Sequence, residues 1–434
     1  MELLQVDTLE ETFQKLESYA RGDGPRGAGL AMETETIPFW QGGGRVLAEN
    51  ILSREDIPPA PRSVMDGYAV CSVDTTGASE GLPVFLRVTQ EVEMGKLPCG
   101  EIGSGECAAI PTGGFLPAGC DAVVMEEYCE TFGADQIAVY TAVSPGRNLV
   151  QTGDDVKKGE MVLPRGKRLQ AADLGVLAAI GKTEIPVYRP WRVHILSTGD
   201  EIVDPREPLR AGKMRDVNSY TLSCMAQAYG FKTSFELLSD DEEILETRVR
   251  EAMHACDLVI VSGGSSQGKK DATAKVIRKL ASAGVLTHGI AVKPGKPTVS
   301  GFDEPTRCAL LGLPGHPVAA ALLFDLLAGR LWKQLSGEEK TKKPRFLYGT
   351  LSMNLPASPG RETLQLVRVC EEDAEETEHA ENAENAGSGK TLRVVPILGK
   401  SGMIRTLSEA DGYLVMERDE EGLKQGAMVK VQLF

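Results

Sequence analysis

Two glycine-rich loops, each placed directly after a short apolar run, constrain the fold of this 434-residue chain more than any other feature. The loop Ser197-Thr-Gly-Asp-Glu201 follows the run 193–196, and Ser262-Gly-Gly-Ser-Ser-Gln-Gly-Lys-Lys-Asp271 follows the run 257–261. Small residues let the backbone approach a ligand and turn its N–H groups inward, while acidic residues can hold a cation. The pattern predicts a site for a phosphorylated ligand and Mg²⁺ at one edge of a parallel sheet.

Residues 187–336 alternate between strand-like and helix-like segments, which indicates βαβ units and an open parallel sheet. Strands are expected at 192–197, 233–238, 257–261 and 308–312. Helices are expected from Asn218, from a cap at Asp240, at 272–283, and after Leu313-Pro-Gly-His-Pro317. Because loops that leave the carboxyl ends of parallel strands share one edge, we expect this last loop to line one crevice with the two glycine-rich loops.

The rest of the chain has other patterns of residues. The full length of 434 residues predicts two to four domains. Residues 1–53 look helical and polar, whereas 54–145 show short strands with frequent Gly and Pro. A loop and a helix at 171–180 follow in 146–186. Residues 344–434 look all-β, as in a small barrel or sandwich.

Composition argues against several classes of protein. The net charge of −15 disfavours nucleic acid as a partner. No N-terminal signal pattern and no run long enough to span a bilayer are present, so no membrane association is expected. Nine scattered cysteines without a CxxC pair favour reduced thiols in the cytoplasm over disulfides or zinc. Eight acids fall in 371–389 without Lys or Arg, and we expect a solvated, mobile loop there.

Each motif also has a plainer interpretation. The second glycine-rich loop nearly matches the phosphate-binding pattern GxxxxGK[ST], but Lys270 replaces the Ser or Thr that ligates Mg²⁺. This disfavours a P-loop nucleotide hydrolase, and a tight turn without a ligand is the other alternative. Asp200 and Glu201 could form a solvated turn. Lys293-Pro-Gly-Lys-Pro297 suits an oxyanion or is a surface turn, and His316 suits a structural position or a ligand edge better than a general base.

Taken in order, these motifs resemble those of the molybdopterin molybdenumtransferase family (bacterial MoeA and the C-terminal region of gephyrin). The resemblance covers nearly the whole chain and includes the loops above and these further segments: Gly44-Arg-Val-Leu-Ala-Glu-Asn50, Ser63-Val-Met-Asp-Gly-Tyr-Ala-Val70, Ile110-Pro-Thr-Gly-Gly114, Phe115 to Val124, and Thr152-Gly-Asp-Asp-Val156. It implies a multidomain α/β plus β architecture. A discontinuous linker and dimerisation domain (1–53 and 146–186) would carry an inserted β-rich domain (54–145). A doubly wound parallel-sheet domain (187–336) and a C-terminal β-barrel (337–434) would follow.

The resemblance also implies a reaction and a set of site residues. Molybdate would be inserted into adenylylated molybdopterin with release of AMP, assisted by Mg²⁺, in a homodimer whose active site lies between subunits. The implied catalytic residues are Asp66, Thr112, Asp155, Glu201 and Asp271, with Glu201 and Asp271 also holding Mg²⁺. The implied substrate-binding residues are Ser262, Gly263, Gly264, Ser265, Gly268, Lys293, Lys296, Pro314, Pro317, Arg361 and Ser401. Asp66 and Thr112 would come from the partner subunit. A molybdopterin adenylyltransferase and recipient molybdoenzymes are the further partners implied.

The chain departs from the family pattern at several positions. Val150-Gln151 and Cys71 stand where basic residues are usual, and the 267–271 loop is more basic than is typical. These departures leave open a paralogue specific for tungstate. A non-catalytic pterin- or partner-binding scaffold is a further alternative, although the retained acids Asp66, Glu201 and Asp271 argue against it.

Overall fold

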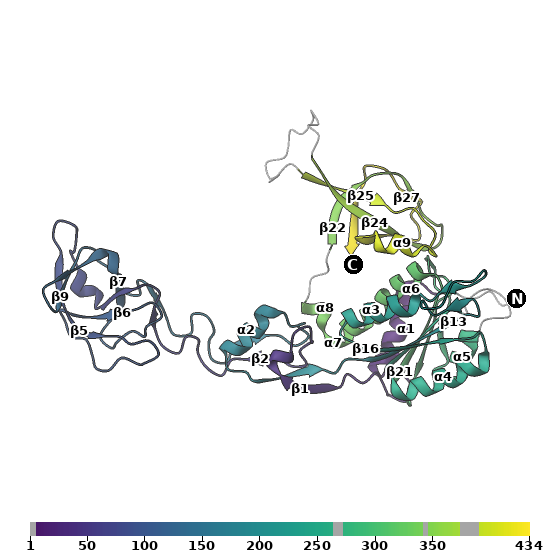
Figure 1. Cartoon of the computed structure of the whole chain (residues 1–434), viewed down its shortest axis with the longest axis horizontal. Helices are drawn as coiled ribbons and strands as arrows, with labels where there is room; N and C mark the ends of the chain where they lie inside the picture. The colour runs from purple at the N-terminus through teal and green to yellow at the C-terminus, as the bar shows by residue number, and fades with distance from the viewer. Residues whose placement is uncertain (1–5, 264–271, 342–345, 374–389) are drawn as a thin grey trace.

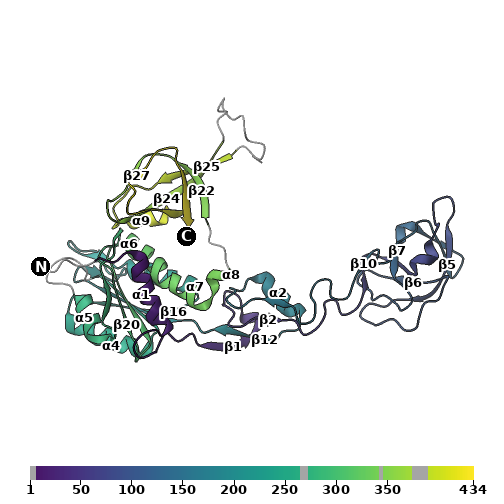
Figure 2. The same cartoon turned by 180° about the vertical axis from the view of Figure 1, so that it is seen from behind.

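The computed structural model describes residues 6–263, 272–341, 346–373 and 390–434. The molecule is elongated (Figures 1 and 2): an α/β domain lies at one end, a slender linker continues from it, and a β-rich domain lies at the far end. A C-terminal barrel packs above the α/β domain. Within the described parts of the chain, no helix is long and apolar enough to cross a membrane.

The α/β domain is built on a six-stranded mixed sheet in the order β16-β13-β17-β21-β20-β18. The first four strands are parallel: β16 (Lys232–Leu238), β13 (Arg192–Thr198), β17 (Leu258–Ser262) and β21 (Cys308–Leu313). The expectation of an all-parallel sheet is wrong at one edge, where β20 (Val299–Asp303) and β18 (Val285–His288) are antiparallel. These two strands are short and carry Ser, Thr and Gly, so no apolar run marks them in the sequence.

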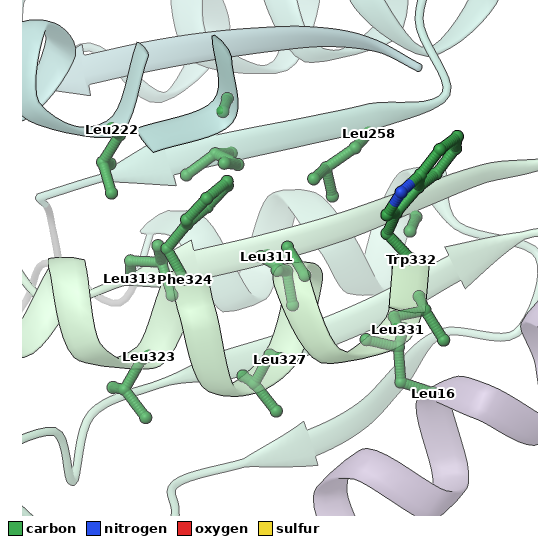
Figure 3. Packing of buried hydrophobic residues seen from close by; sticks show 14 of the residues in the cluster. Leu16, Leu222, Leu258, Leu311, Leu313, Leu323, Phe324, Leu327, Leu331 and Trp332 are labelled. Carbon is green, nitrogen blue, oxygen red and sulfur yellow. The ribbon is translucent and has the colours of Figure 1, made fainter. Parts of the chain in front are cut away.

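Helices cover both faces of this sheet. One face is packed by α4 (Glu242–Ala255) and α5 (Ala272–Leu280). The other is packed by α3 (Asn218–Ala228), α6 (Pro317–Leu323), a π-helical turn η4 (Phe324–Gly329) and α7 (Arg330–Ser336). Figure 3 shows Leu323, Phe324, Leu327 and Leu331 from this continuous helix beside Leu311 and Leu313 of β21. The predicted helices are confirmed, although Asp241 rather than Asp240 caps α4.

Residues 1–53 are not mainly helical as expected. Helix α1 (Leu9–Arg21) is followed by β1 (Thr34–Pro38) and β2 (Ile51–Leu52), which pair with β12 (Glu184–Tyr188) and β11 (Met161–Leu163) of the linker. Helix α1 itself packs on β18, β20 and α7 of the α/β domain, which differs from its assignment to the linker. Helix α2 (Ala171–Ala179) completes the linker as predicted.

The β-rich domain holds a second six-stranded sheet in the order β7-β4-β6-β5-β9-β8. Its strands are β4 (Gly67–Val70), β5 (Val84–Glu91), β6 (Glu106–Ile110), β7 (Ala122–Met125), β8 (Cys129–Phe132) and β9 (Gln136–Val139). All pairs except β5 with β6 are antiparallel. This agrees with the strand-rich texture read from 54–145.

The C-terminal region forms a closed barrel of five strands, which confirms the expected barrel. The strands are β22 (Phe346–Leu351), β24 (Glu362–Asp373), β25 (Lys390–Pro396), β26 (Gly412–Met416) and β28 (Met428–Leu433), and pairing of β24 with β26 closes the ring. The expectation of an acidic loop from 371 is wrong for Glu371–Asp373, because these residues continue β24 and pair with β25. Residues 374–389 lie outside the described parts of the chain.

Candidate functional site

The loops that leave β13, β17 and β21 meet at the carboxyl edge of the sheet, as the sequence predicts. Gly263 has a φ of +113°, and a Cβ atom built on it would lie 2.3 Å from the carbonyl oxygen of Thr198. Its N–H donates to the carbonyl oxygen of Leu313 at 3.3 Å. Glycine is required here because a side chain would collide with the neighbouring backbone.

Asn218, at the start of α3, ties these loops together and was missed as a site residue. Its Nδ2 donates to Oγ of Ser262 at 2.7 Å and to the carbonyl oxygen of Gly315 at 3.0 Å. Its Oδ1 is buried and has no hydrogen-bond partner among the described residues, as is also true of Oγ1 of Thr198. Unpaired buried polar atoms cost free energy, so both are candidates to accept or donate a hydrogen bond when a ligand binds.

A second network of buried hydrogen bonds lies under the loop 197–201. Oδ1 of Asp216 accepts hydrogen bonds from Oγ of Ser197 at 3.2 Å and from the N–H of Ser219 at 3.1 Å. The Ser197 and Ser219 hydroxyls are 3.0 Å apart. Asp216 was also missed, because nothing in the local sequence shows that its side chain folds back beneath β13.

Glu201 lies in the turn directly after β13, with its side chain exposed. Its carbonyl oxygen accepts from the N–H of Met214 at 2.8 Å, which fixes the backbone of the turn. Four other predicted site residues, Gly264, Ser265, Gly268 and Asp271, lie outside the described residues. Within the described residues, no group of three or more His, Cys, Asp or Glu side chains could hold a metal ion.

The predicted oxyanion residues lie at two contacts between the barrel and the α/β domain. Strand β19 (Val292–Lys293) pairs with the start of β24, with Lys293 opposite Thr363, so Arg361 lies two residues from this pair. Gly295 has a φ of +131°, and a Cβ atom there would lie 2.5 Å from Cδ1 of Leu323. The turn that carries Lys293 and Lys296 is therefore seated closely on α6 and faces the barrel.

Ser401 of the barrel contacts the loop after β21. Its Oγ lies 2.8 Å from Nδ1 of His316, and its carbonyl oxygen accepts from the N–H of Val318 at 3.2 Å. Pro314 is buried, and Pro317 is buried at the first turn of α6, where its missing N–H costs nothing. Lys293, Lys296, Arg361, His316 and Ser401 thus belong to one junction between two domains.

Asp66 and Thr112 lie together, but at the other end of the chain. Oδ1 of Asp66 accepts from the N–H of Thr112 at 2.7 Å, and both residues are exposed on the β-rich domain. Asp155 is exposed, and its N–H donates to the carbonyl oxygen of Ile57 in the segment that joins this domain to the linker. Figure 1 shows the length of the linker between this domain and the α/β domain. One chain therefore does not bring these three residues to Glu201.

Known proteins share this arrangement of domains. Three family models match in sequence: the MoeA N-terminal region (domain I and II) over 8–181, a probable molybdopterin binding domain over 194–333, and the MoeA C-terminal region (domain IV) over 348–434. A molybdopterin molybdenumtransferase of Haemophilus influenzae is 35% identical over 77% of this chain and 80% of its own. The chain belongs to the molybdopterin molybdenumtransferase family.

Further relatives of this family are similar over almost the full length. A putative molybdopterin biosynthesis protein of Methanocaldococcus jannaschii is 32% identical over 90% of this chain and 89% of its own. The crystal structure of the molybdopterin biosynthesis MoeA protein from Pyrococcus horikoshii superimposes with a TM-score of 0.80 at 28% identity, covering 99% of this chain and 100% of that one. Membership of the molybdopterin molybdenumtransferase family makes this chain a transferase of molybdenum cofactor biosynthesis.

Proposed function

We propose that this protein inserts molybdate into adenylylated molybdopterin and releases AMP. The observation that carries the proposal is the junction of the α/β domain with the barrel, where β19, which carries Lys293, pairs with β24 beside Arg361, and where Ser401 contacts the loop after β21. Hydrogen-bond donors held in fixed positions bind an oxyanion, and Lys and Arg side chains add charge-assisted hydrogen bonds. We assign Lys293, Lys296, Arg361 and Ser401 to molybdate.

The phosphoanhydride of the substrate would lie beside the glycine-rich loops. Gly263 brings the backbone close, and the Ser262 hydroxyl is already oriented by Asn218 at 2.7 Å. Backbone N–H groups at such a loop suit phosphate oxygens. We infer that Gly264, Ser265 and Gly268 extend the same cradle, with Pro314 and Pro317 fixing the neighbouring loop.

We assign Glu201 and Asp271 to Mg²⁺, and of these two carboxylates Glu201 lies among the residues that the structure describes. Mg²⁺ keeps several waters and usually takes one or two carboxylates plus phosphate oxygens from the substrate, so a cluster of protein ligands is not needed. An exposed Glu201 on a fixed turn fits that requirement. When bound, the ion would neutralise charge on the pyrophosphate, while Glu201 fixes its position.

A second copy of the chain would complete the site. Asp66 and Thr112 form a hydrogen-bonded pair on an exposed surface of the β-rich domain, at the far end of the molecule, and Asp155 lies where this domain joins the linker. The linker also exposes apolar side chains: Leu52 and Met161 lie opposite each other in the β2–β11 pair and are 53% and 52% exposed. We infer a homodimer in which the β-rich domain of one subunit reaches the α/β domain of the other.

Location and further partners follow from the same proposal. All nine cysteines are free thiols, and five of them, at positions 107, 120, 129, 256 and 308, have pKa values raised by burial. Such thiols suit the reducing cytoplasm. We expect an adenylyltransferase that makes the substrate and molybdoenzymes that receive the product to be the functional partners.

Reconstitution tests the proposal. Purified protein, adenylylated molybdopterin, Mg²⁺ and either molybdate or tungstate are combined, and AMP release and cofactor formation are followed. We expect AMP release to require the oxyanion, to fall at least 100-fold in Glu201→Gln, and to stop when EDTA removes Mg²⁺. Glu80→Gln, which changes an exposed acid of the β-rich domain, is the control and keeps full activity.

Comparing molybdate with tungstate distinguishes the proposed function from a tungstate-specific paralogue and from a non-catalytic scaffold. A strong preference for tungstate would change the assigned substrate but not the reaction. Tight binding of the pterin without AMP release under any condition, unchanged in Glu201→Gln, would contradict the proposal and favour a scaffold.

A further inference from the structure

An open depression of about 740 Å³ lies on the α/β domain, beside the segment that follows β13. Its walls come from three places: the loop segment 204–217 after β13, the exposed side of α3 with edge strand β16, and α9 (Ile404–Ser408) of the barrel. Ile404 closes it from the barrel side. Ile404 is three residues from Ser401, so the depression lies at the same domain junction as the site.

Two aromatic rings form one wall of this depression. Tyr220 of α3 and Phe235 of β16 have ring centroids 5.1 Å apart and are 43% and 44% exposed. Because both rings are partly exposed, they keep surface available to a planar ligand. Aromatic faces of this kind bind nucleobases by stacking, with little dependence on the base.

Polar groups face the same space. Asp216 lines it and is only 6% exposed; its Oδ1 is used by Ser197 and Ser219, while its Oδ2 has no hydrogen-bond partner among the described residues. Carboxylate oxygens at the end of a parallel sheet commonly accept hydrogen bonds from ribose hydroxyls.

Two arginines lie on the rim. Arg215 makes no ion pair with any residue in the described parts of the chain. Arg206 is paired with Asp204 at 2.7 Å, and this hydrogen-bonded pair lowers the pKa of Asp204 to about 2. Arg215 is thus the cation on this rim that is available to a phosphate or to the face of a base.

We propose that this depression binds the adenosine half of the substrate, with the base on Tyr220 and Phe235, the ribose on Asp216, and Arg215 toward the α-phosphate. The assignment rests on the proposed function and on the order of sites along the sheet edge. The second glycine-rich loop follows β17, and the depression lies beside the segment that follows β13, the neighbouring strand of the sheet. In adenylylated molybdopterin the adenosine is joined directly to the pyrophosphate, so neighbouring strand ends suit these two groups.

Binding of AMP tests this directly. Dissociation constants for AMP and for molybdopterin without the nucleotide are measured by calorimetry on full-length wild type, Tyr220→Leu, Phe235→Leu and Arg215→Gln. We expect each aromatic variant to weaken AMP about tenfold and to leave molybdopterin within about twofold. Phe85→Leu, which alters an exposed ring of the β-rich domain paired with Phe132, is the matched control and leaves both constants unchanged.

Three results would overturn the proposal: unchanged AMP affinity in both aromatic variants, no AMP binding by wild type, or weakening of molybdopterin in place of AMP, which would assign the depression to the pterin. Melting temperatures within about 2 °C of wild type exclude unfolding as the cause. Oxyanion-dependent AMP release is measured separately on wild type. If that activity is absent while AMP binding still depends on Tyr220 and Phe235, the proposed function fails and the nucleotide site stands.

Discussion

Asp257 illustrates how a single carboxylate joins the start of β17 to the linker. Burial alone would raise its pKa, but hydrogen bonds from Arg189, at 2.9 and 3.2 Å, and from the N–H of Arg192, at 2.7 Å, lower it below the usual 3.8. The folded protein therefore favours the ionised form. Its stabilising contribution is present above pH 3.8 and is lost as the pH falls through the lower folded pKa.

Replacing this carboxylate should reduce stability in a pH-dependent way. Asp257→Asn leaves Arg189 largely uncompensated, since Glu33 is its other acidic partner and is mostly exposed. We expect a loss of about 2–4 kcal/mol in the free energy of unfolding at pH 7. Urea titrations of wild type and Asp257→Asn from pH 7 to pH 3 should show that the difference in their free energies of unfolding shrinks below about pH 4. A difference that stays constant with pH would contradict the lowered pKa of Asp257.

At Gly263 the backbone conformation and the close neighbouring backbone leave no room for a side chain. We expect Gly263→Ala to cost about 1–3 kcal/mol, because a φ of +113° and a 2.3 Å contact with the Thr198 carbonyl cannot be relieved without moving the loops. AMP release should fall by about 100-fold as the loops shift. Gly43→Ala is the control, since a Cβ atom there meets nothing within 4 Å. Equal activity of the two variants would contradict this role.

At this scale the sequence predicted where part of the candidate site lies. Ser262, Gly263 and Glu201 could be found because small and acidic residues follow apolar runs, and strand ends fix where such loops lie. Asn218 and Asp216 could not, because their importance depends on side chains that turn under loops distant in sequence: Asn218 bonds Ser262, 44 residues away, and Asp216 bonds Ser197, 19 residues away. The residues at 264–271 remain sequence-based assignments.

Helix α1 shows that hydrophobic periodicity alone does not determine which domain a helix packs against. Its sequence gives a clear helix, with a capping box from Thr8 and Glu11 and a left-handed Gly22 at its end. The pattern says that one face is buried but not against which domain. In the structure Phe13 and Leu16 join the core of the α/β domain, and the Arg330 guanidinium lies 3.7 Å from the Phe13 ring centroid. Similarly, β18 and β20 were missed because pairing, not composition, makes them strands.

Removing one buried side chain from α1 should therefore destabilise the α/β domain. Leu16 is fully buried, and we expect Leu16→Ala to lower the free energy of unfolding by about 2–5 kcal/mol. Leu97→Ala, at a site that is 71% exposed, should change it by less than about 0.5 kcal/mol. Calorimetric unfolding of both variants checks this. A small effect at Leu16 would mean that α1 contributes little to that core.

On the scale of the whole molecule, the elongated shape separates two sets of site residues that the sequence could only list together. Order along the chain and strand periodicity predicted an α/β region and a β-rich region, but not the long linker that separates the β-rich domain, which carries Asp66, from the α/β domain, which carries Glu201 (Figure 1). Asp66 and Thr112 are exposed and hydrogen-bonded to each other on a domain that the linker holds away from Glu201. The homodimer that we propose would bring these two sets of residues into one site.

Complementation between two disabled subunits tests this shared site most directly. Asp66→Asn and Glu201→Gln chains carrying different affinity tags are co-expressed, and dimers bearing both tags are purified. Each homodimer should be inactive, whereas the mixed dimer keeps one intact site and should release AMP at about half the wild-type rate in the presence of molybdate. A mixed dimer as inactive as the parents, although both tags are present, would contradict the shared site.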